Sequence, residues 1–266
     1  MNMTFSKKIV WITGASSGIG EALVYNLVAQ GATVIASSEN EKQLLQVKKN
    51  CGKNENSCFI QVFDMEHEDN YQELTEKIIQ THKKIDILLH VAGVSQRSSD
   101  EDISLETIRK IFEINFFGTV ALNKAVLPYM KAQGCGHIAV TSSIVGKFGF
   151  PMRSAYSASK HALHGYFETL RAELYGKNIP VTIIIPGRIN TAISDNALTG
   201  NGKPWGKRDA GLAASLSAEY AAKKILKSIR KNKREVLIGG KELIMVHLKR
   251  FLPAIFWKIV NRVSPT

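Results

Sequence analysis

Short apolar runs alternate with longer amphipathic stretches over most of the chain. The apolar runs are rich in Val, Ile and Leu and show little alternation with polar residues, which is typical of parallel strands buried on both faces. They occupy residues 8–14, 32–37, 58–63, 85–93, 136–143, 180–187 and 235–240. Apolar residues at helical spacing predict helices between them, over residues 19–30, 40–50, 67–84, 105–133, 154–175 and 218–232.

This order of elements predicts an α/β fold. Strands separated by helices pair in parallel through right-handed crossovers, and the helices then cover both faces of the sheet. We expect a Rossmann-type, doubly wound parallel sheet of about seven strands in the order 3-2-1-4-5-6-7. No change of composition marks a second domain, so residues 1–240 are expected to form a single domain, followed by a basic, apolar C-terminal extension at 241–266.

The basic residues are concentrated near the C-terminus. The chain carries 35 Lys and Arg against 23 Asp and Glu, a formal net charge of +12. Residues 223–262 hold twelve of the basic residues and two of the acidic ones, so the rest of the chain is nearly balanced. Because a basic surface over the main body is missing, we expect no nucleic-acid partner.

The cysteine pattern gives no sign of a disulfide framework or a metal site. Cys51, Cys58 and Cys135 are odd in number and have neither metal-ligand nor C-x-x-C spacing. This usage fits a reducing compartment. No secretory signal is recognised near the N-terminus, and we expect a cytoplasmic protein.

A glycine-rich turn joins the first predicted strand to the first predicted helix. It reads TGASSGIG, residues 13–20, with glycines at positions 14, 18 and 20. Such glycines permit a tight turn and a close ligand, and the following helix offers free N–H groups to a pyrophosphate. The spacing differs from G-x-G-x-x-G, and a turn without a ligand is the simpler alternative.

The stretch YSASK, residues 156–160, places Tyr156 and Lys160 one helical turn apart, with small residues between them. A free tyrosine has a pKa of about 10, too high for an efficient base at neutral pH. Because a nearby positive charge favours the tyrosinate, Lys160 is expected to lower the pKa of Tyr156. Two polar residues on an ordinary helix are the alternative interpretation.

Several motifs together resemble the short-chain dehydrogenase/reductase family, of the compact type. TGASSGIG is similar to the family's cofactor turn, and YSASK is similar to its Y-x-x-x-K helix. Ser143 precedes Tyr156 by thirteen residues, the family's usual offset, and Asn115 in EINFFGTV is similar to its catalytic asparagine. PGRINT, residues 186–191, is similar to the segment that contacts the nicotinamide. The resemblance covers roughly residues 7–239, and residues 141–162 are similar to the dehydrogenase/reductase member 7 group of the family.

The resemblance implies an NAD(P)-dependent oxidoreductase that interconverts a hydrophobic secondary alcohol and its ketone. Catalytic roles are implied for Asn115, Ser143, Tyr156 and Lys160, with Asn115 kinking its helix and holding a water that relays protons to Lys160. The residues implied to bind the cofactor are Gly14, Ser16, Ser17, Gly18, Ile19, Gly20, Ser38, Glu39, Asp64, Met65, Ala92, Gly93, Tyr156, Lys160, Pro186, Gly187, Ile189 and Thr191. The residues implied to contact the substrate are Ser143, Phe150, Met152 and Tyr156.

The choice between NAD and NADP depends on the end of the second predicted strand. An acid there binds the ribose 2′-hydroxyl of NAD, whereas a nearby arginine accepts the 2′-phosphate of NADP. Ser38 and Glu39 occupy these positions, so neither marker is present. If Glu39 points inward it repels a 2′-phosphate, which favours NAD slightly. If it points to solvent, Ser37 and Ser38 could accept a phosphate.

Residues 90–93, HVAG, depart from the N-N-A-G pattern of the family. Ala92 and Gly93 are retained, and they belong to the cofactor side. We expect altered packing rather than lost activity, with His90 as a structural histidine whose hydrogen bonding is satisfied.

The predicted substrate side is apolar, since Phe148, Phe150, Pro151 and Met152 follow Ser143. The glycine-containing loop at about 191–217 is expected to form a lid that closes over the substrate. Trp205 in this loop could either cap a hydrophobic substrate or anchor the loop.

The C-terminal extension mixes apolar residues with Lys249, Arg250, Lys258 and Arg262. Its charge-free runs are too short to span a membrane. One interpretation is peripheral membrane contact through an interfacial amphipathic segment. The other is packing on the domain or on a partner subunit, since the family resemblance suggests a homodimer or homotetramer.

Two other functions are alternatives to the oxidoreductase. A catalytically silent regulatory or scaffold protein of the same fold would bind the cofactor without turnover, although Ser143, Tyr156 and Lys160 are all present. A sugar-nucleotide epimerase also uses Tyr and Lys, but its usual T-G-x-x-G-x-x-G turn differs from the turn found here.

Overall fold

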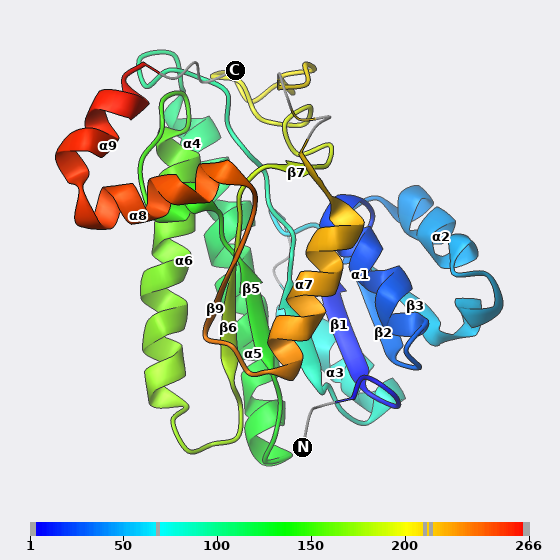
Figure 1. Ribbon diagram of the computed structural model, residues 1–266. Helices are drawn as coiled ribbons and strands as arrows, with labels where there is room; N and C mark the ends of the chain where they lie inside the picture. The colour runs from blue at the N-terminus through cyan, green and yellow to red at the C-terminus, as the bar shows by residue number, and fades with distance from the viewer. Residues whose placement is uncertain (1–3, 68–69, 210–211, 213–214, 263–266) are drawn as a thin grey trace.

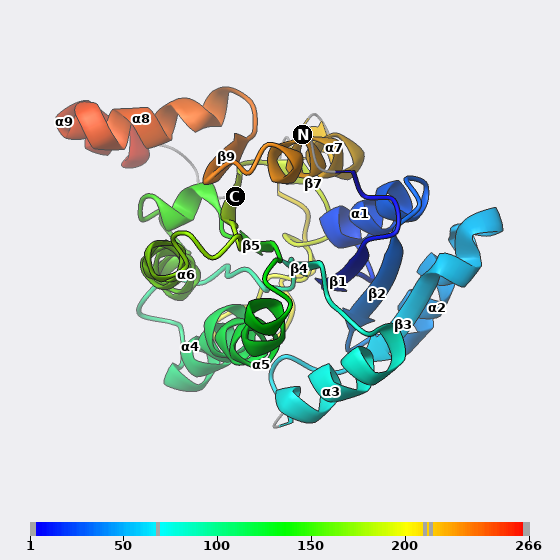
Figure 2. The same ribbon diagram turned by 90° about the horizontal axis from the view of Figure 1, so that it is seen from below.

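The computed structural model describes residues 4–67, 70–209, 212 and 215–262 of the 266-residue chain. At its centre lies a seven-stranded sheet with the order β3-β2-β1-β4-β5-β6-β9, and helices lie on both faces (Figures 1 and 2). All six strand pairings in this sheet are parallel. The doubly wound fold and its predicted strand order are therefore confirmed, with β9 as the seventh strand of the sheet.

The strands coincide with the apolar runs of the sequence. They are β1 (Ile9–Thr13), β2 (Thr33–Ser38), β3 (Cys58–Val62), β4 (Ile87–His90), β5 (Ile138–Thr141), β6 (Val181–Pro186) and β9 (Glu235–Ile238). Because successive side chains of a strand point to opposite faces, Val10 and Ile12 enter one core cluster and Trp11 enters the other.

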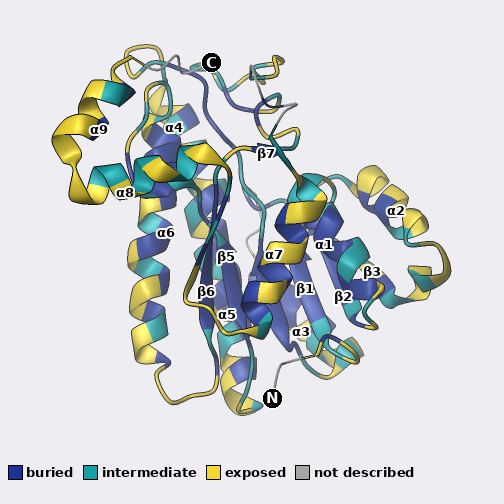
Figure 3. Ribbon diagram, in the orientation of Figure 1, coloured by how far each residue is buried: buried dark blue, intermediate teal, exposed yellow. Residues whose placement is uncertain are grey.

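Each face of the sheet is covered by its own set of helices, whose inner sides are buried (Figure 3). The helices that pack on the face of Val10 and Ile12 are α1 (Gly18–Val28), α2 (Glu41–Asn50) and α7 (Ala218–Arg230). The helices that pack on the face of Trp11 are α3 (Tyr71–His82), α5 (Gly118–Ala132) and α6 (Ser154–Glu173). Removing this apolar surface from water, at roughly 25 cal/mol per Å², is the main force that holds the layers together.

The predicted helix over residues 105–133 is interrupted. It consists of α4 (Leu105–Phe112), the π-helical segment η2 (Glu113–Phe117) and α5. Short π-helical segments inside α-helices are frequent at functional sites, and this one contains Asn115.

Shorter elements complete the carboxyl edge of the sheet. A 3-10 turn η3 (Ile144–Gly146) follows β5, and β7 (Ile189–Asn190) pairs with β8 (Leu216–Ser217). After β9 come the 3-10 turn η4 (Lys241–Leu243) and two helices, α8 (Ile244–Phe251) and α9 (Pro253–Val260), which project at the periphery of the molecule (Figure 1). No helix within the described residues has the length and apolar character needed to cross a membrane.

Candidate active site

A cavity of about 500 Å³ opens at the carboxyl edge of the sheet, where doubly wound folds bind their ligands. Most of the residues that the sequence assigned to the site lie in its wall. They are Gly14, Ser16, Ser17, Gly18, Ile19, Gly20, Ser38, Glu39, Asp64, Met65, Ala92, Gly93, Ser143, Tyr156, Lys160, Pro186, Gly187, Ile189 and Thr191. Asn115, Phe150 and Met152 are not part of the wall.

The turn between β1 and α1 leaves room only for glycine at two positions. Gly14 has a φ of 64°, and a Cβ there would lie 2.7 Å from the Cα of Ala92. A Cβ on Gly20 would lie 2.0 Å from the carbonyl oxygen of Gly14. The N-cap residue Ser17 makes no side-chain capping bond, so the first N–H groups of α1 remain available to a ligand. The turn is therefore a cradle of main-chain atoms that suits a phosphate group.

Glu39 lies at the rim of the cavity, next to the end of β2. Ser16 donates a hydrogen bond to Ser38 Oγ (2.9 Å), and Ser38 in turn donates to Glu39 Oε2 (2.8 Å). All three residues line the cavity, although Glu39 is also exposed to solvent. Glu39 thus combines the two alternatives considered for it, since it both lines the cavity and reaches solvent.

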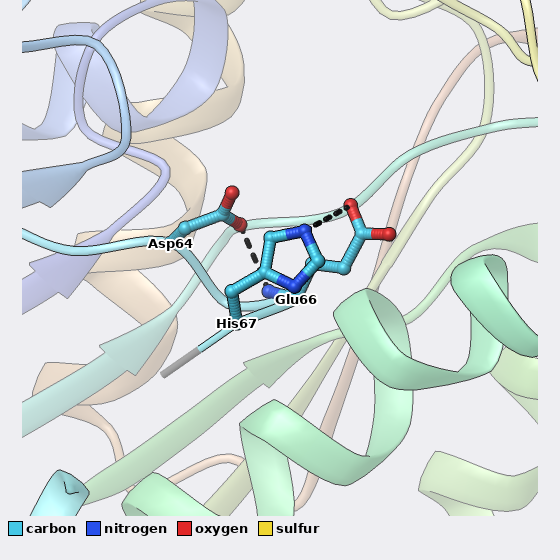
Figure 4. A group of neighbouring side chains, drawn as sticks. All are labelled: Asp64, Glu66 and His67. Carbon is cyan, nitrogen blue, oxygen red and sulfur yellow. Dashed lines mark hydrogen bonds and ion pairs between the residues drawn. The ribbon is translucent and has the colours of Figure 1, made fainter. Parts of the chain in front are cut away.

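A polar turn after β3 forms another part of the rim (Figure 4). Asp64 Oδ1 accepts a hydrogen bond from the main-chain N–H of Glu66 (2.8 Å), and His67 Nε2 lies 3.7 Å from Glu66 Oε2. These three side chains are close enough to share a metal ion. However, Lys110 Nζ lies 2.6 Å from the same Glu66 oxygen, so an ammonium group already neutralises this carboxylate.

Tyr156 lies in the first turn of α6 and is 7% exposed. Burial raises the pKa of its phenol above the ordinary value, while the Ser143 hydroxyl and the charges of Arg153 and Arg97 act in the opposite direction. A net lowering of this pKa, which was expected from Lys160, is not found in the chain without cofactor. The net shift is upward, and the charges that oppose it belong to the two arginines. The phenol therefore keeps its proton at neutral pH.

Lys160 is buried one turn further along α6. Its Nζ donates to the main-chain carbonyl of Thr141 (2.9 Å) and lies 5.8 Å from the ring centroid of Tyr156. Burial lowers the pKa of Lys160 to about 8. Thr141 could not be found from the sequence. It binds the Lys160 ammonium through its main-chain carbonyl, and every residue type has such a carbonyl.

Ser143 is the second residue after the end of β5 and caps η3. Its Oγ accepts a long hydrogen bond from the N–H of Val145 (3.4 Å) and also interacts with the Tyr156 hydroxyl. Behind it, Ser142 donates to the carbonyl of Lys160 (3.1 Å), and its Oγ lies 2.9 Å from His164 Nε2. Ser142 and His164, which the sequence analysis did not single out, thus join β5 to α6 beneath the site.

Asn115 is fully buried within the π-helical segment. Its Oδ1 accepts from the N–H of Val94 (2.8 Å), and its Nδ2 donates to the carbonyl of Val94 and to Ser159 Oγ (both 3.0 Å). A Cβ on Gly93 would lie 2.9 Å from Asn115 Oδ1 and 3.1 Å from Lys160 Nζ. The amide therefore lies close to the lysine, and the water between them stays a prediction.

A residue of the C-terminal extension holds the segment after β6. Glu242 Oε1 accepts hydrogen bonds from the N–H groups of Arg188 (2.9 Å) and Gly240 (3.0 Å). A Cβ on Gly187 would lie 2.4 Å from the same oxygen, so the carboxylate fits only against glycine. The sequence analysis missed Glu242 because it lies outside the motifs that resemble the family.

Phe150 and Met152, predicted to contact the substrate, lie away from the cavity wall. Phe150 packs on an apolar cluster that includes Phe148 and Phe256, and its ring centroid lies 5.3 Å from the guanidinium of Arg153. Met152 has a φ of 60°, and its carbonyl accepts from the N–H of Ser98. Phe150 thus packs on the cluster that contains Tyr156, outside the cavity wall, and the substrate contacts of both residues stay predictions.

His90 departs from its predicted hydrogen bonding. It is 1% exposed, and neither ring nitrogen has a hydrogen-bond partner. Its ring instead lies 5.9 Å from the ring of Phe167. Burial lowers the pKa of His90 to about 3, which keeps the imidazole neutral. The expectation that the hydrogen bonding of His90 is satisfied is therefore wrong. Its neutral ring instead fills space in the apolar core.

The described part of the predicted lid is fixed to the domain at several points. Leu198 forms isolated bridges with Gln96 and Pro204, and Asp209 forms an ion pair with Arg97. Trp205 donates its main-chain N–H to the carbonyl of Ala197 (2.7 Å). The role of its indole ring stays a prediction. Residues 210–211 and 213–214 of the predicted lid lie outside the described residues.

A second group with metal-binding potential lies on the far side of α6. His164, Glu168 and Glu235 bring their ligand atoms together, but Lys147 Nζ lies 2.9 Å from Glu235 Oε1 and 4.0 Å from Glu168 Oε1. As at Glu66, a lysine ammonium neutralises the carboxylates. This group is best described as an ion-paired network that joins α6 to β9.

Comparison with known proteins agrees with this geometry. The model of the short chain dehydrogenase family matches residues 8–201. Over 261 residues the chain is 35% identical to a dehydrogenase/reductase SDR family protein 7-like from Drosophila melanogaster, covering 96% of this chain and 80% of that protein. It is 37% identical over 257 residues to the dehydrogenase/reductase SDR family member 7B of Mus musculus, covering 95% and 80%.

Solved structures share the fold along nearly the whole chain. A short-chain dehydrogenase from Streptomyces avermitilis superposes with a TM-score of 0.80 at 25% identity, covering 97% of this chain and 98% of that one. A short chain dehydrogenase/reductase from Burkholderia phymatum, solved in complex with NAD, gives a TM-score of 0.84 at 23% identity and 99% coverage of both chains. The second likeness concerns the fold alone.

Proposed function

This chain belongs to the short-chain dehydrogenase/reductase family of oxidoreductases, and from this premise we propose that it interconverts an apolar secondary alcohol and its ketone with a nicotinamide dinucleotide. One observation carries the proposal. Tyr156, Lys160 and Ser143 share the wall of a single cavity with the glycine turn that precedes α1.

The residues of the cavity fit a dinucleotide. A Cβ on Gly14 or Gly20 would collide with neighbouring main chain, so these glycines permit the tight turn whose N–H groups can hold a pyrophosphate. All of the following residues line the cavity, and we assign Asp64 and Met65 to the adenine side and Pro186, Gly187 and Thr191 to the nicotinamide side. When bound, the nicotinamide supplies or accepts the hydride.

The chain's own side chains handle the proton. In ketone reduction the Tyr156 hydroxyl donates its proton to the carbonyl oxygen, while Ser143 donates a hydrogen bond to that oxygen and holds it in place. In alcohol oxidation the same oxygen atom of Tyr156 takes the proton back. The Thr141 carbonyl fixes Lys160 in the cavity wall, where its ammonium can hold a ribose hydroxyl and stabilise the tyrosinate as it forms.

NAD is the preferred cofactor in this proposal. The Glu39 carboxylate, held by Ser38 at the rim, would lie near the adenine ribose. It can accept a hydrogen bond from a 2′-hydroxyl, but it repels a 2′-phosphate.

A turnover assay of the Tyr156→Phe variant tests the proposal. The purified chain is assayed with a panel of apolar ketones and both NADH and NADPH, and cofactor binding is measured by fluorescence. We expect turnover in the wild type, a loss of roughly a thousandfold or more in the variant, and cofactor affinity within about threefold, because only the proton donor is removed.

Two results would contradict the proposal. Turnover that survives in Tyr156→Phe would remove the tyrosine from the reaction. Tight cofactor binding without turnover of any ketone would indicate the catalytically silent regulatory or scaffold protein instead.

A further inference from the structure

The two C-terminal helices carry an apolar surface that none of the described residues covers. Phe251, Leu252 and Ile255, at the corner between α8 and α9, are 68%, 49% and 47% exposed. Ile244 on α8 and Trp257 on α9 are 59% and 45% exposed. Figure 3 shows this corner as a continuous exposed segment that projects from the side of the molecule. We call these five residues the apolar corner.

The opposite side of the same helices is anchored in the protein core. Phe256 and Val260 of α9 are 0% and 2% exposed and pack in one cluster with Val145, Phe148 and Tyr156. The rings of Phe148 and Phe256 lie 5.2 Å apart. The docking of α9 therefore needs only its inner side, and the apolar corner is left free for another partner.

The charges carried by α8 and α9 are all positive. Residues 243–262 contain Lys249, Arg250, Lys258 and Arg262 and no acidic residue. Lys249 Nζ lies 4.5 Å from the ring centroid of Trp257, so a cation lies at the edge of the exposed aromatic surface. Residues 251–257, which include four of the five residues of the apolar corner, carry no charge.

This charge pattern discriminates between the possible occupants. A symmetric contact with a second copy would place the same four cations opposite one another, and like charges across an interface oppose association. An anionic bilayer instead attracts the cations and offers its acyl chains to the apolar corner. Each helix has eight residues, far fewer than the roughly 20 needed to span a bilayer, so contact is limited to one leaflet.

We propose that α8 and α9 dock this protein on an anionic lipid surface. The apolar corner enters the region between headgroups and acyl chains, and Arg250 and Lys258 contact the anionic headgroups. This inference rests on the helices alone and does not depend on the proposed reaction.

Vesicle binding of the full chain tests the proposal. Co-sedimentation is measured with vesicles of phosphatidylcholine alone and of phosphatidylcholine mixed with phosphatidylglycerol, each at low and high salt. We expect binding to the mixed vesicles that weakens with salt, and much weaker binding to phosphatidylcholine. Arg250→Glu with Lys258→Glu should lower the partition coefficient on mixed vesicles by at least about tenfold, since each basic residue near such a surface contributes about 1 kcal/mol.

Two further variants distinguish lipid binding through the apolar corner from nonspecific attraction by the net charge of the protein. Phe251→Ser with Ile255→Ser keeps every charge and should lower partitioning by about tenfold, because two apolar side chains no longer enter the lipid. Lys231→Glu with Lys233→Glu makes the same change of net charge in the exposed turn before β9, at the opposite edge of the sheet, and should bind like the wild type. Thermal unfolding of each variant checks that the fold is retained.

Three outcomes would overturn the proposal. The first is no binding of the wild type to mixed vesicles. The second is equal loss in both charge-reversal variants, which would indicate general attraction of a basic protein. The third is a dimer in sedimentation velocity that Phe251→Ser with Ile255→Ser abolishes, which would show that a second copy covers the apolar corner.

Discussion

Burial acts in opposite directions on the two ionisable side chains of the proposed proton path. It raises the pKa of Tyr156 and lowers that of Lys160 to about 8, because in each case the charged form loses its hydration. The phenol is thus held as a proton donor in the free protein. Ordinary helical spacing explains why the two residues are neighbours, but their ionisation states follow from the packing around them.

The rim position of Glu39 leads to a prediction about cofactor choice. Replacing Glu39 by Arg removes the carboxylate that Ser38 holds and introduces a guanidinium that can pair with a 2′-phosphate. We expect the ratio of NADPH to NADH affinity to rise by about tenfold or more, roughly the difference of one charge-assisted interaction. Fluorescence titration of the wild type and the variant with both cofactors measures it. Glu41→Arg, an exposed change in the first turn of α2, is the matched control. An unchanged ratio in Glu39→Arg would show that position 39 does not contact the ribose.

At the scale of elements, two irregular segments position the site. The π-helical segment between α4 and α5 contains Asn115, whose amide binds the main chain of Val94 after β4 and the hydroxyl of Ser159 on α6. The turn η4 brings Glu242 back over Gly187, so the end of β6 is held by a residue that follows β9. In both cases a side chain, that of Asn115 or of Glu242, provides hydrogen bonds to main-chain groups outside regular elements.

The Glu242 contact predicts an effect on cofactor affinity. Partial burial opposes ionisation of Glu242, but the N–H groups of Arg188 and Gly240 outweigh it and lower the pKa of the carboxyl. Glu242→Ala removes the acceptor of both N–H groups and should loosen the segment on the nicotinamide side. We expect cofactor affinity to fall by about tenfold, consistent with one to two hydrogen bonds of about 1 kcal/mol each.

The variant Glu242→Gln provides the matched comparison, because its Oε1 can still accept both hydrogen bonds. It should keep cofactor affinity within about threefold of the wild type, since only the charge is lost. Turnover at saturating cofactor should change little in either variant, because neither touches the reacting atoms. If both variants lower only the melting temperature and leave the affinity unchanged, Glu242 stabilises the fold without positioning the cofactor segment.

For the whole molecule, buried histidines make stability depend on pH. Burial lowers the pKa of His90 to about 3 and those of His137 and His164 to about 4. In the unfolded chain these groups titrate at about 6.5. Below pH 6.5 these three histidines are therefore protonated in the unfolded chain, whereas they stay neutral in the folded protein. The stability they contribute is complete above pH 6.5 and is lost as the pH falls toward 4.

We expect the free energy of unfolding to fall steeply between pH 6.5 and pH 4. Its slope with pH should approach the value for three protons taken up on unfolding, one for each histidine. Denaturant titration at several pH values measures the slope. His90→Leu should lower it by about one proton and should not destabilise the protein at pH 7 by more than about 1 kcal/mol, because both ring nitrogens lack partners. A flat profile above pH 5 would contradict the prediction.

Much of the fold was predictable because apolar runs and helical spacing are local signals. The strand order and the grouping of Ser143, Tyr156 and Lys160 on one wall follow from that topology. Tertiary contacts decided the rest. The pKa of Tyr156 depends on burial, and the Thr141 and Glu242 contacts use main-chain atoms or distant residues. Phe150 packs on an apolar cluster outside the cavity wall. No single-sequence pattern carries such information.

The shared cluster of Phe256 and Tyr156 has a consequence for acidity. Since burial is what raises the pKa of Tyr156, any state in which α9 leaves Phe148 brings that pKa back toward its ordinary value. Titration of one phenol is thereby linked to the docking equilibrium of the final helix. By reciprocity, ionising Tyr156 weakens the hold of that helix on the domain to the same extent.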